Sequence, residues 1–346
     1  MFSALIEKVM RREDLTSSEA AAAMAEVMEG RAADAQIAGL LIGLAMKGER
    51  PAEIVGLART MRAHAVKVSR RFDDVFDTCG TGGDHSGTFN ISSAVALVVA
   101  GAGVRVAKHG NRSVSSQCGS ADVFETLGVR VSAPAAVVER CLADAGIGFF
   151  FAPTFHPSMR HAGATRKALG VRTAFNLLGP LTNPAGASRQ LVGVPKPEFT
   201  ELIARSLLLL GSTRAWVVHG SDGIDEISTT GYTKISECRD GSVNTFYLHP
   251  ADVGLPKVPQ AAIRGGSAAD NAELIRAVLA GERGPARDIV VLNAGAALLI
   301  AGKAASLADG MALAADSIDR GAAARALEQM AALSMADESP KGAGAP

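Results

Sequence analysis

Two polar, glycine-rich segments have the composition of a phosphate-binding site. Residues 77–84 read Asp-Thr-Cys-Gly-Thr-Gly-Gly-Asp and lie between a short apolar run and a helix-like stretch at 90–97. Such a glycine turn exposes backbone N–H groups, and the helix N-terminus adds a partial positive charge. Residues 108–116 read Lys-His-Gly-Asn-Arg-Ser-Val-Ser-Ser, and their cations form charge-assisted bonds to phosphate oxygens. We therefore predict a cradle for a substrate with more than one phosphate.

Neither segment matches a common nucleotide-binding motif. The glycine loop lacks the closing Gly-Lys-Ser/Thr of a P-loop and the spacing of the dinucleotide fingerprint. Alone, the loop is compatible with an ordinary strand-to-helix turn, and the basic segment with a solvated turn. There are more polar residues around the start of the next helix than a helix cap requires, which favours a phosphate-binding site. These residues are Asp84, Thr88, Asn90, Ser92 and Ser93.

A third segment supplies carboxylates. Residues 219–228 follow an apolar run and contain Asp222 and the adjacent pair Asp225 and Glu226. Mg²⁺ prefers oxygen ligands and bridges to substrate phosphates, so the pair suits a magnesium site. An exposed acidic loop remains the alternative. The basic residues between 160 and 172 are likewise compatible with one charged helix face.

Composition limits the class of protein. The 346 residues are 48% apolar and 20% charged, as in a soluble globular enzyme. Lys+Arg and Asp+Glu both number 35, which argues against a non-specific nucleic-acid binder. The four cysteines form no C-x-x-C pair and fit reduced thiols in a cytoplasm. No apolar stretch approaches a membrane span or signal peptide, so we expect a cytoplasmic protein.

The patterning predicts an α/β protein with a small N-terminal helical domain, residues 1–70, joined to a larger α/β domain, residues 71–335. The helical segment near 165–188 is expected to pack with the helical domain, and the tail 336–346 to be disordered. Alternating apolar runs and helices predict a mainly parallel central sheet with an antiparallel hairpin at 232–248. The expected parallel strands are Val75–Asp77, Val104–Ala107, Val129–Val131, Ile147–Phe151, Leu191–Val194 and Ala215–His219.

Taken together, these segments resemble the anthranilate phosphoribosyltransferase family. The resemblance runs from the helical start to about Leu333. It rests on several motifs in the family's order: Gly80–Asp84, Thr88–Ser92, Lys108–Ser116, Gly119–Asp122, Phe155–Pro157, Arg172–Pro180 and Asp225-Glu226.

The resemblance implies an active site in the cleft between the two domains and a homodimer built through the helical domains. It also implies transfer of the 5-phosphoribosyl group from Mg²⁺-bound 5-phospho-α-D-ribose 1-diphosphate, the donor, to the amino group of anthranilate. N-(5-phosphoribosyl)anthranilate and diphosphate are the products, in the second step of tryptophan biosynthesis from chorismate. No nucleic acid or membrane partner is expected.

The resemblance also assigns residues. Those expected to bind the donor are Gly80, Gly83, Asp84, Thr88, Asn90, Ile91, Ser92, Ser93, Lys108, His109, Gly110, Asn111, Arg112, Ser113, Val114, Ser115, Ser116 and Ser120. Gly80, Asn111 and Arg166 are expected at the anthranilate site, and Ser92, Asp225 and Glu226 as metal ligands. Lys108, Asp84 and Arg112 are the predicted catalytic residues. Lys108 and Mg²⁺ would stabilise charge on the departing diphosphate.

Two other functions stay open. A pyrimidine nucleoside phosphorylase has a related fold, but it has little need for the acidic pair, and its pattern differs at 108–112. A nucleic-acid-binding relative without transferase activity is disfavoured by the neutral net charge and the intact donor and metal motifs.

Overall fold

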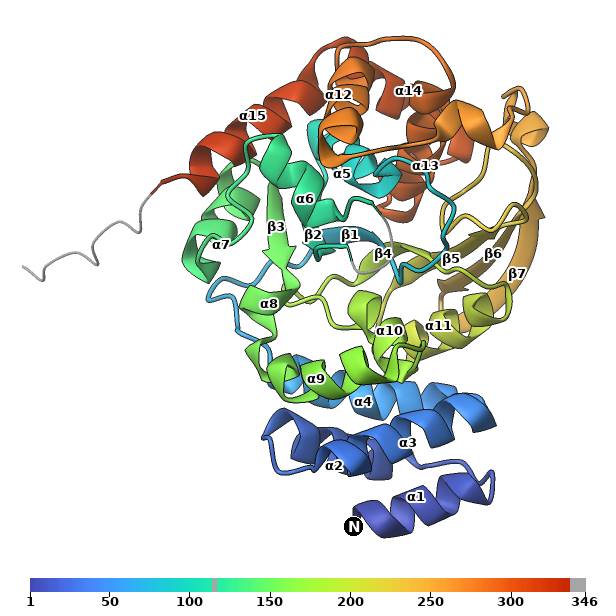
Figure 1. The fold of residues 1–346 in the computed structure, drawn as a ribbon. Helices are drawn as coiled ribbons and strands as arrows, with labels where there is room; N and C mark the ends of the chain where they lie inside the picture. The colour runs from blue at the N-terminus through green and yellow to red at the C-terminus, as the bar shows by residue number, and fades with distance from the viewer. Residues whose placement is uncertain (114–116, 337–346) are drawn as a thin grey trace, which may run out of the picture.

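The computed structural model describes residues 1–113 and 117–336 (Figure 1). Four helices come first: α1 (Phe2–Met10), α2 (Ser17–Met28), α3 (Asp34–Lys47) and α4 (Pro51–Ala63). A capping box begins α2, since the Glu19 amide donates to Thr16 Oγ1 and the Thr16 amide to the Glu19 carboxylate. The predicted donor residues Val114, Ser115 and Ser116, and the tail from 337, lie outside the described residues.

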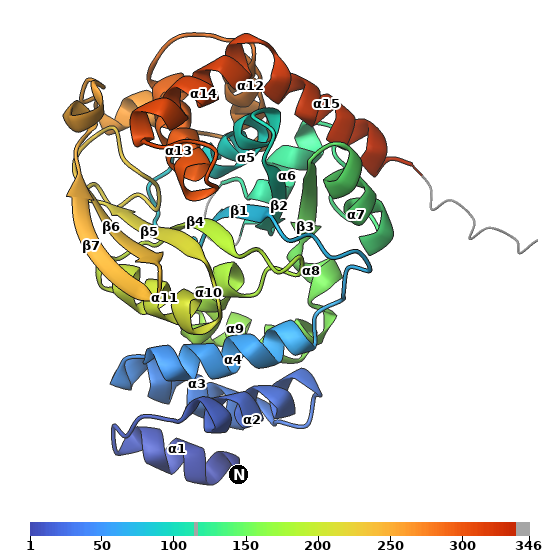
Figure 2. The ribbon, with the colours of Figure 1, turned by 180° about the vertical axis from the view of Figure 1, so that it is seen from behind.

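A seven-stranded sheet forms the centre, in the order β3-β2-β1-β4-β5-β6-β7 (Figures 1 and 2). Its strands are β1 (Val75–Gly80), β2 (Arg105–Gly110), β3 (Ile147–Phe151), β4 (Arg189–Gly193), β5 (Arg214–Gly220), β6 (Thr233–Arg239) and β7 (Ser242–Leu248). Strands β1 to β5 pair in parallel, and β5, β6 and β7 pair antiparallel. The predicted mainly parallel sheet with a terminal hairpin is confirmed.

The strand order places a crevice-forming edge beside β1. The chain proceeds from β1 to β2 and β3 on one side and returns to β4 on the other, so the connections reverse direction at β1. Ligands of open α/β sheets bind at the carboxyl ends of strands at such a switch point. Gly80 ends β1 and is paired with Gly193 at the end of β4, and Gly110 ends β2 at the same edge. The two predicted phosphate-binding segments therefore leave neighbouring strands side by side.

Helices cover both faces of the sheet. Further elements are α5 (Ile91–Gly101), α6 (Ser120–Thr126), α7 (Ala135–Asp144), α11 (Glu198–Leu209), α12 (Ala268–Leu279), α13 (Pro285–Ile300), α14 (Leu307–Asp319), α15 (Ala322–Ser334), and 3₁₀ turns at Pro157–Met159, Gly179–Leu181, Pro250–Val253 and Gln260–Ile263. In Figure 1, α12 to α15 lie on the upper side and the N-terminal helices on the lower side. Strand residues alternate between the two cores: Leu191 packs with the upper helices, and Val192 with α11 and the N-terminal helices.

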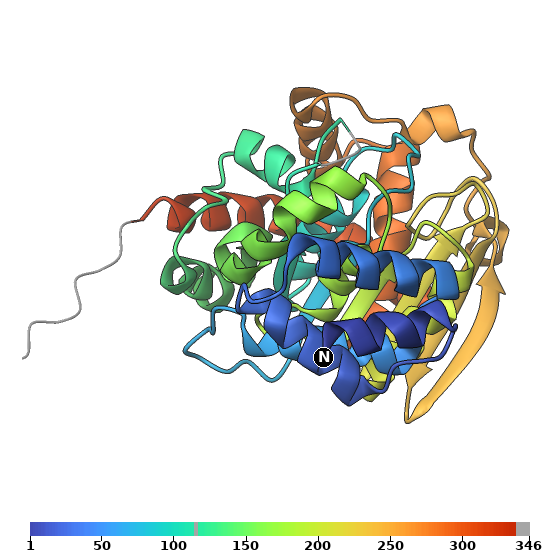
Figure 3. The same cartoon turned by 60° about the horizontal axis from the view of Figure 1, so that its bottom comes forward.

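The chain between β3 and β4 packs against the N-terminal helices. It forms α8 (Ala152–Phe155), α9 (Arg160–Leu169) and α10 (Ala174–Leu178). Phe175, Leu178 and Leu181 share a buried cluster with side chains of α2, α3 and α4, and Figure 3 shows the N-terminal helices as one group over this segment. The chain thus crosses from the sheet to the N-terminal helices and returns to the sheet at β4.

One predicted strand is wrong. Val129 and Val131 are each 2% exposed, but they lie in a turn between α6 and α7 and pair with no strand. The Arg130 amide donates to Ser334 Oγ at 2.9 Å, so α15 satisfies a backbone group that a strand would have paired in a sheet. Short apolar runs indicate burial, and burial is compatible with either conformation. No helix of the described residues is long and apolar enough to span a bilayer.

Candidate active site

The glycine loop and the acidic loop touch at the end of β1. Gly82 and Gly83 have φ angles of 67° and 75°, a conformation that glycine adopts without strain. The Gly82 amide donates to the Asp225 carboxylate. A methyl group on Gly80 would collide with the same carboxylate, so only glycine permits this approach. The two loops, far apart in sequence, therefore build one surface.

Carboxylates concentrate at this point. Asp84 lies close enough to Asp225 for its negative charge to act on it, and the Ser92 amide at the start of α5 donates to Glu226. Burial raises the pKa of both Asp225 and Glu226, because it removes the charged carboxylate from water. Neighbouring negative charge raises them further: Asp84 acts on Asp225, and Asp225 on Glu226. The cluster holds more negative charge than its surroundings balance.

Lys108 is the cation beside this cluster. Its side chain is on β2, and the residue is 2% exposed. Its Nζ donates to the carbonyl oxygen of Thr78 at 2.6 Å and lies 3.4 Å from Ser92 Oγ. Its charge acts against the upward pKa shift of Glu226 without reversing it. The ammonium group of Lys108, on the second phosphate-binding segment, is therefore held by a hydrogen bond to Thr78 on the first.

The acidic cluster fits a divalent cation. Neither Asp225 nor Glu226 forms an ion pair within the part of the chain that the structure describes. Over the same residues, no three His, Cys, Asp or Glu side chains are placed to enclose a metal by themselves. Mg²⁺ commonly uses one or two protein carboxylates and takes its other ligands from water and substrate phosphates. Two carboxylates and the Ser92 hydroxyl at an open edge match that donor set.

The segment after β2 divides into inward and outward residues. His109 is 6% exposed, its amide donates to Asp77, and its Nδ1 lies 3.0 Å from the Gly179 carbonyl oxygen. Burial lowers the pKa of His109 to about 3, so its ring is neutral. This ring therefore contacts Gly179 and packs against the ring of His156.

The outward residues of this segment form ion pairs and hydrogen bonds with the start of α6. The Arg112 guanidinium is exposed and paired with Asp122 and Glu125 at 2.8 Å each. Ser120 Oγ donates to the Asn111 carbonyl oxygen at 3.3 Å, and the Ser113 amide to Asp122 at 3.2 Å. Gly110 lacks room for a methyl group because Ser120 Oγ lies against it. A phosphate at Arg112 would have to compete with both carboxylates.

The start of α5 holds the remaining predicted donor residues. Ile91 and Ser93 are buried, and Ser93 Oγ has no hydrogen-bond partner in the described chain. Thr88 Oγ1 lies 3.2 Å from Ser86 Oγ, which also donates to Asp84. Asn90 is different, because its side-chain amide is already bonded on both sides: it accepts from Asn271 and donates to the Cys118 carbonyl oxygen.

Arg166 presents a guanidinium without an acidic partner. It is half-buried on α9, its guanidinium carbon lies 5.2 Å from the centre of the Phe175 ring, and burial lowers its pKa. Its guanidinium forms no hydrogen bond or ion pair among the described residues. A cation held against an aromatic ring in this way is suited to a carboxylate ligand.

Sequence reasoning gave Arg172 no role, although it lies at the glycine loop. Its Nη1 donates to the Gly82 carbonyl oxygen at 2.7 Å, and its Nη2 is buried without a partner in the described chain. A methyl group on Gly83 would strike this guanidinium. The cluster of basic residues at 160–172 could have indicated a binding role for Arg172, but it fitted a charged helix face equally well.

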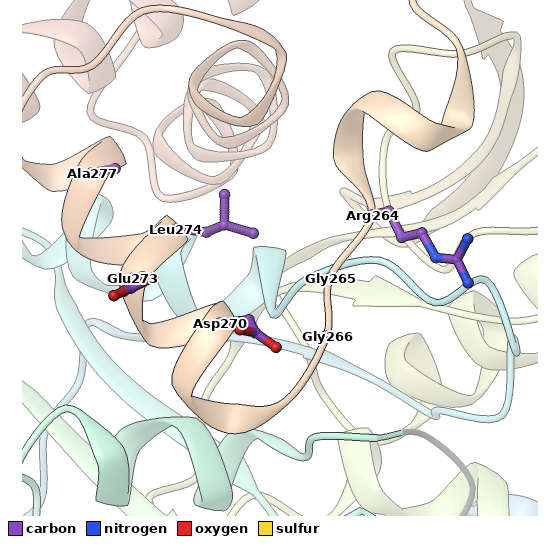
Figure 4. Close-up of a pocket in the computed structure, with 7 residues that line it drawn as sticks. All are labelled: Arg264, Gly265, Gly266, Asp270, Glu273, Leu274 and Ala277. Carbon is purple, nitrogen blue, oxygen red and sulfur yellow. The ribbon is translucent and has the colours of Figure 1, made fainter.

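The sequence also gave no indication that the chain before α12 lies beside the glycine-loop segment. The amide of Gly265 donates to the Gly87 carbonyl oxygen at 2.9 Å, and Thr88 pairs with Arg264 in an isolated bridge. Beside it lies a hollow of about 390 Å³. Figure 4 shows that its lining comes from this chain and the first turns of α12: Arg264, Gly265, Gly266, Asp270, Glu273, Leu274 and Ala277. None of the predicted site residues lines it.

Comparison with known proteins identifies the family. The glycosyl transferase family a/b domain matches residues 73–324, and the helical bundle domain of the same family matches residues 3–65. Anthranilate phosphoribosyltransferase of Moorella thermoacetica is 54% identical over 332 residues, covering 96% of this chain and 98% of that protein. The chain belongs to the anthranilate phosphoribosyltransferase family. The predicted family, fold class and activity are confirmed, and the phosphorylase and nucleic-acid-binding alternatives are not supported.

Solved structures of the anthranilate phosphoribosyltransferase family agree in fold. The enzyme from Thermus thermophilus superposes with a TM-score of 0.90 at 43% identity, covering 96% of this chain and 99% of that one. The Saccharomyces cerevisiae enzyme in complex with PRPP and Mg has a TM-score of 0.88 at 26% identity, with coverage of 96% and 97%. PRPP is the phosphoribosyl diphosphate expected as donor.

Proposed function

We propose that this chain transfers the 5-phosphoribosyl group of PRPP to the amino group of anthranilate at the edge formed by β1, β2 and β5. The observation that carries this placement is the cluster of Asp84, Asp225 and Glu226 with Lys108 at the glycine loop. It combines excess carboxylate, a fixed cation and exposed backbone at one switch point. A donor with several phosphates and a divalent cation matches all three.

Ser92, Asp225 and Glu226 would hold Mg²⁺, as the unbalanced carboxylates indicate. When bound, Mg²⁺ supplies Lewis-acid stabilisation of the negative charge on the departing diphosphate. The yeast relative was solved with PRPP and Mg, which supports the same cation here.

The residues of the chain supply positioning and charge. Lys108 Nζ, fixed by the Thr78 carbonyl, stabilises diphosphate charge as the glycosidic bond breaks. The amides of the glycine loop around Gly83 orient the phosphate oxygens, and the N-terminus of α5, which begins at Ile91, adds its partial positive charge. Asp84 adds negative charge beside the proposed metal ligands, and Arg112 binds phosphate by exchanging its contacts with Asp122 and Glu125. No nucleophile of the protein is required, because the anthranilate amine attacks a cation-like ribose carbon.

Anthranilate binds on the opposite wall. Arg166 on α9 pairs with its carboxylate, and Asn111 and Gly80 border the space between the two substrates. The unpaired guanidinium against Phe175 supports this role for Arg166. Because α9 packs on the helical unit and the glycine loop leaves the sheet, the two substrates would meet between the two domains, proposed at 1–70 and 71–335.

We propose that the protein is a homodimer through the helical domain and works in the cytoplasm. Met10 on α1 and Met46 on α3 are each 74% exposed, which leaves apolar side chains uncovered on the outer helices. Light scattering at micromolar concentration should give twice the chain mass. A fully active monomer would refute the dimer.

One assay tests the proposed function. Loss of anthranilate fluorescence should require both PRPP and Mg²⁺, and mass spectrometry should detect N-(5-phosphoribosyl)anthranilate. Chelation of Mg²⁺ should stop the reaction. Phosphorolysis of thymidine, measured in parallel with inorganic phosphate, should be absent. Activity in the second assay alone would refute the proposal.

A further inference from the structure

Asn271 connects three separate parts of the chain at the donor side of the site. It lies on α12, in the C-terminal third, and is 2% exposed. Its Nδ2 donates to Asn90 Oδ1 at 2.9 Å, and its Oδ1 accepts from the Gly266 amide at 2.8 Å. It also hydrogen-bonds the Cys118 thiol. Asn271 is not among the residues assigned to a substrate or to the metal.

The partner of Asn271 explains what these bonds hold. Asn90 precedes the first residue of α5, and its Nδ2 continues the chain of hydrogen bonds to the Cys118 carbonyl oxygen at 3.2 Å. Both functional groups of the Asn90 amide are thus engaged inside the protein. The side chain that sequence reasoning assigned to the donor is occupied in fixing the two segments that carry the other donor residues.

Each of these two segments begins within two residues of Asn90 or Cys118. Ser92 and Ser93 follow Asn90 in the first turn of α5, and Ser120 follows Cys118 at the start of α6. The directions of the Ser92 and Ser93 hydroxyls depend on the orientation of this first turn, and Ser93 Oγ has no hydrogen-bond partner in the described chain. Rotation of the Asn90 backbone would therefore redirect several donor contacts together.

The chain before α12 is shaped for this contact. A methyl group on Gly265 would collide with Asn271 Oδ1 and with the backbone of Phe89. The Phe89 amide donates to the Ile263 carbonyl oxygen at 3.3 Å, so the donor loop and this chain are paired as well. Close backbone approach and a buried amide thus form one support behind residues 87–90.

We propose that Asn271 is a positioning residue for donor binding, which acts through Asn90 on the N-terminal turn of α5. This inference rests on the proposed function, because it presumes that this turn binds PRPP. A buried amide bonded on all sides resists rotation, since any other orientation leaves polar groups unsatisfied. Asn271 itself touches no substrate.

Calorimetric titration of PRPP in the presence of Mg²⁺ tests this with Asn271→Ala and Asn271→Asp. The second variant keeps an acceptor for the Gly266 amide and loses the donor to Asn90. Both should raise the PRPP Kd by about 5- to 150-fold, the range for an unsatisfied buried hydrogen-bonding group. The anthranilate KM should stay within about twofold, because Arg166 is on another wall. Glu273→Ala, exposed on the same helix, is the matched control and should leave the Kd unchanged.

The same titration separates positioning from general damage. A destabilised protein loses binding-competent molecules, so its stoichiometry falls while its Kd stays constant, whereas a misplaced turn raises the Kd at full stoichiometry. The double variant with Asn90→Ala should bind no more weakly than Asn90→Ala alone, since Asn271 acts through Asn90. Additive losses, an unchanged Kd, or variants that cannot be obtained folded would overturn the inference. Failure of the unaltered protein to bind PRPP would instead refute the proposed function.

Discussion

The guanidinium of Arg172 is hydrogen-bonded to the carbonyl oxygen of Gly82, with 2.7 Å between Nη1 and the oxygen. Arg172 belongs to the chain between α9 and α10, and Gly82 to the loop after β1. This bond ties the wall that packs on the helical unit to the loop that would hold the donor. Because Gly82 also donates to Asp225, a movement of Arg172 reaches the acidic cluster through one residue.

We expect Arg172→Ala to lower kcat/KM for PRPP by about 5- to 150-fold, since removal of a charged partner from a hydrogen bond costs about 1–3 kcal/mol. Arg172→Lys keeps the charge and one donor, so its loss should be smaller. Steady-state kinetics with PRPP varied at saturating anthranilate measures both. Arg160→Ala, exposed on the same segment, is the control. An equal loss in the control would show that general charge is the cause.

Replacing Asp225 and Glu226 together with alanine should abolish most Mg²⁺-dependent turnover, because both carboxylates of the proposed metal site are gone. Asp225→Asn with Glu226→Gln removes the charge and keeps the shape, so circular dichroism should show an unchanged fold. Activity is measured as a function of Mg²⁺ concentration. Asp240→Asn, at an exposed turn, should behave as the unaltered protein. Near-normal turnover of the double variant at limiting Mg²⁺ would show that the metal assignment is wrong.

The change Arg166→Ala should raise the anthranilate KM strongly and the PRPP KM little. Loss of one partner from a buried charge pair costs about 2–5 kcal/mol, or roughly 30- to several-thousand-fold in binding. Steady-state kinetics with each substrate varied in turn measures the split. Lys167→Ala, exposed and adjacent on α9, should change neither KM. A defect confined to PRPP would place Arg166 at a phosphate instead.

Stability should fall as the pH drops below 6.5, partly through His109 and His156. Burial lowers their pKa values to about 3 and about 4 in the folded protein. Between about pH 4 and 6.5 the unfolded chain therefore binds protons that the folded chain does not. Each histidine then costs about 1.4 kcal/mol per pH unit, or roughly 2 kcal/mol at pH 5.

Urea unfolding at pH 5 and pH 8 tests this with His156→Gln. The variant should lose about 2 kcal/mol less than the unaltered protein between the two pH values. Comparing the two proteins cancels the opposing contribution of Asp225 and Glu226, whose raised pKa values favour the folded state as the pH falls. The pH 8 measurement reports the cost of the substitution itself. Parallel pH profiles would show that His156 is not the source.

The sequence by itself determined the local elements and the chemistry of the loops. Ile147–Phe151 was predicted as a strand with its observed bounds, because its four apolar residues, interrupted only by Gly148, form a signal that is read locally. The capping box at Thr16 is equally local. The roles of Asp225, Glu226 and Lys108 depended on residue types together with the order of several motifs, since each segment alone also suited a solvated turn.

The tertiary structure decided which distant residues support the site. Arg172 reaches Gly82 over 90 positions, and Asn271 reaches Asn90 over 181. Bonds between residues so far apart impose no period on the sequence, and a single polar side chain leaves the same signal whether it is solvated or buried. Val129–Val131 failed as a strand for the same reason, because its buried backbone is satisfied by Ser334 on a helix 204 positions from Arg130. Local patterns report which residues avoid water, and only the packed chain determines which groups meet.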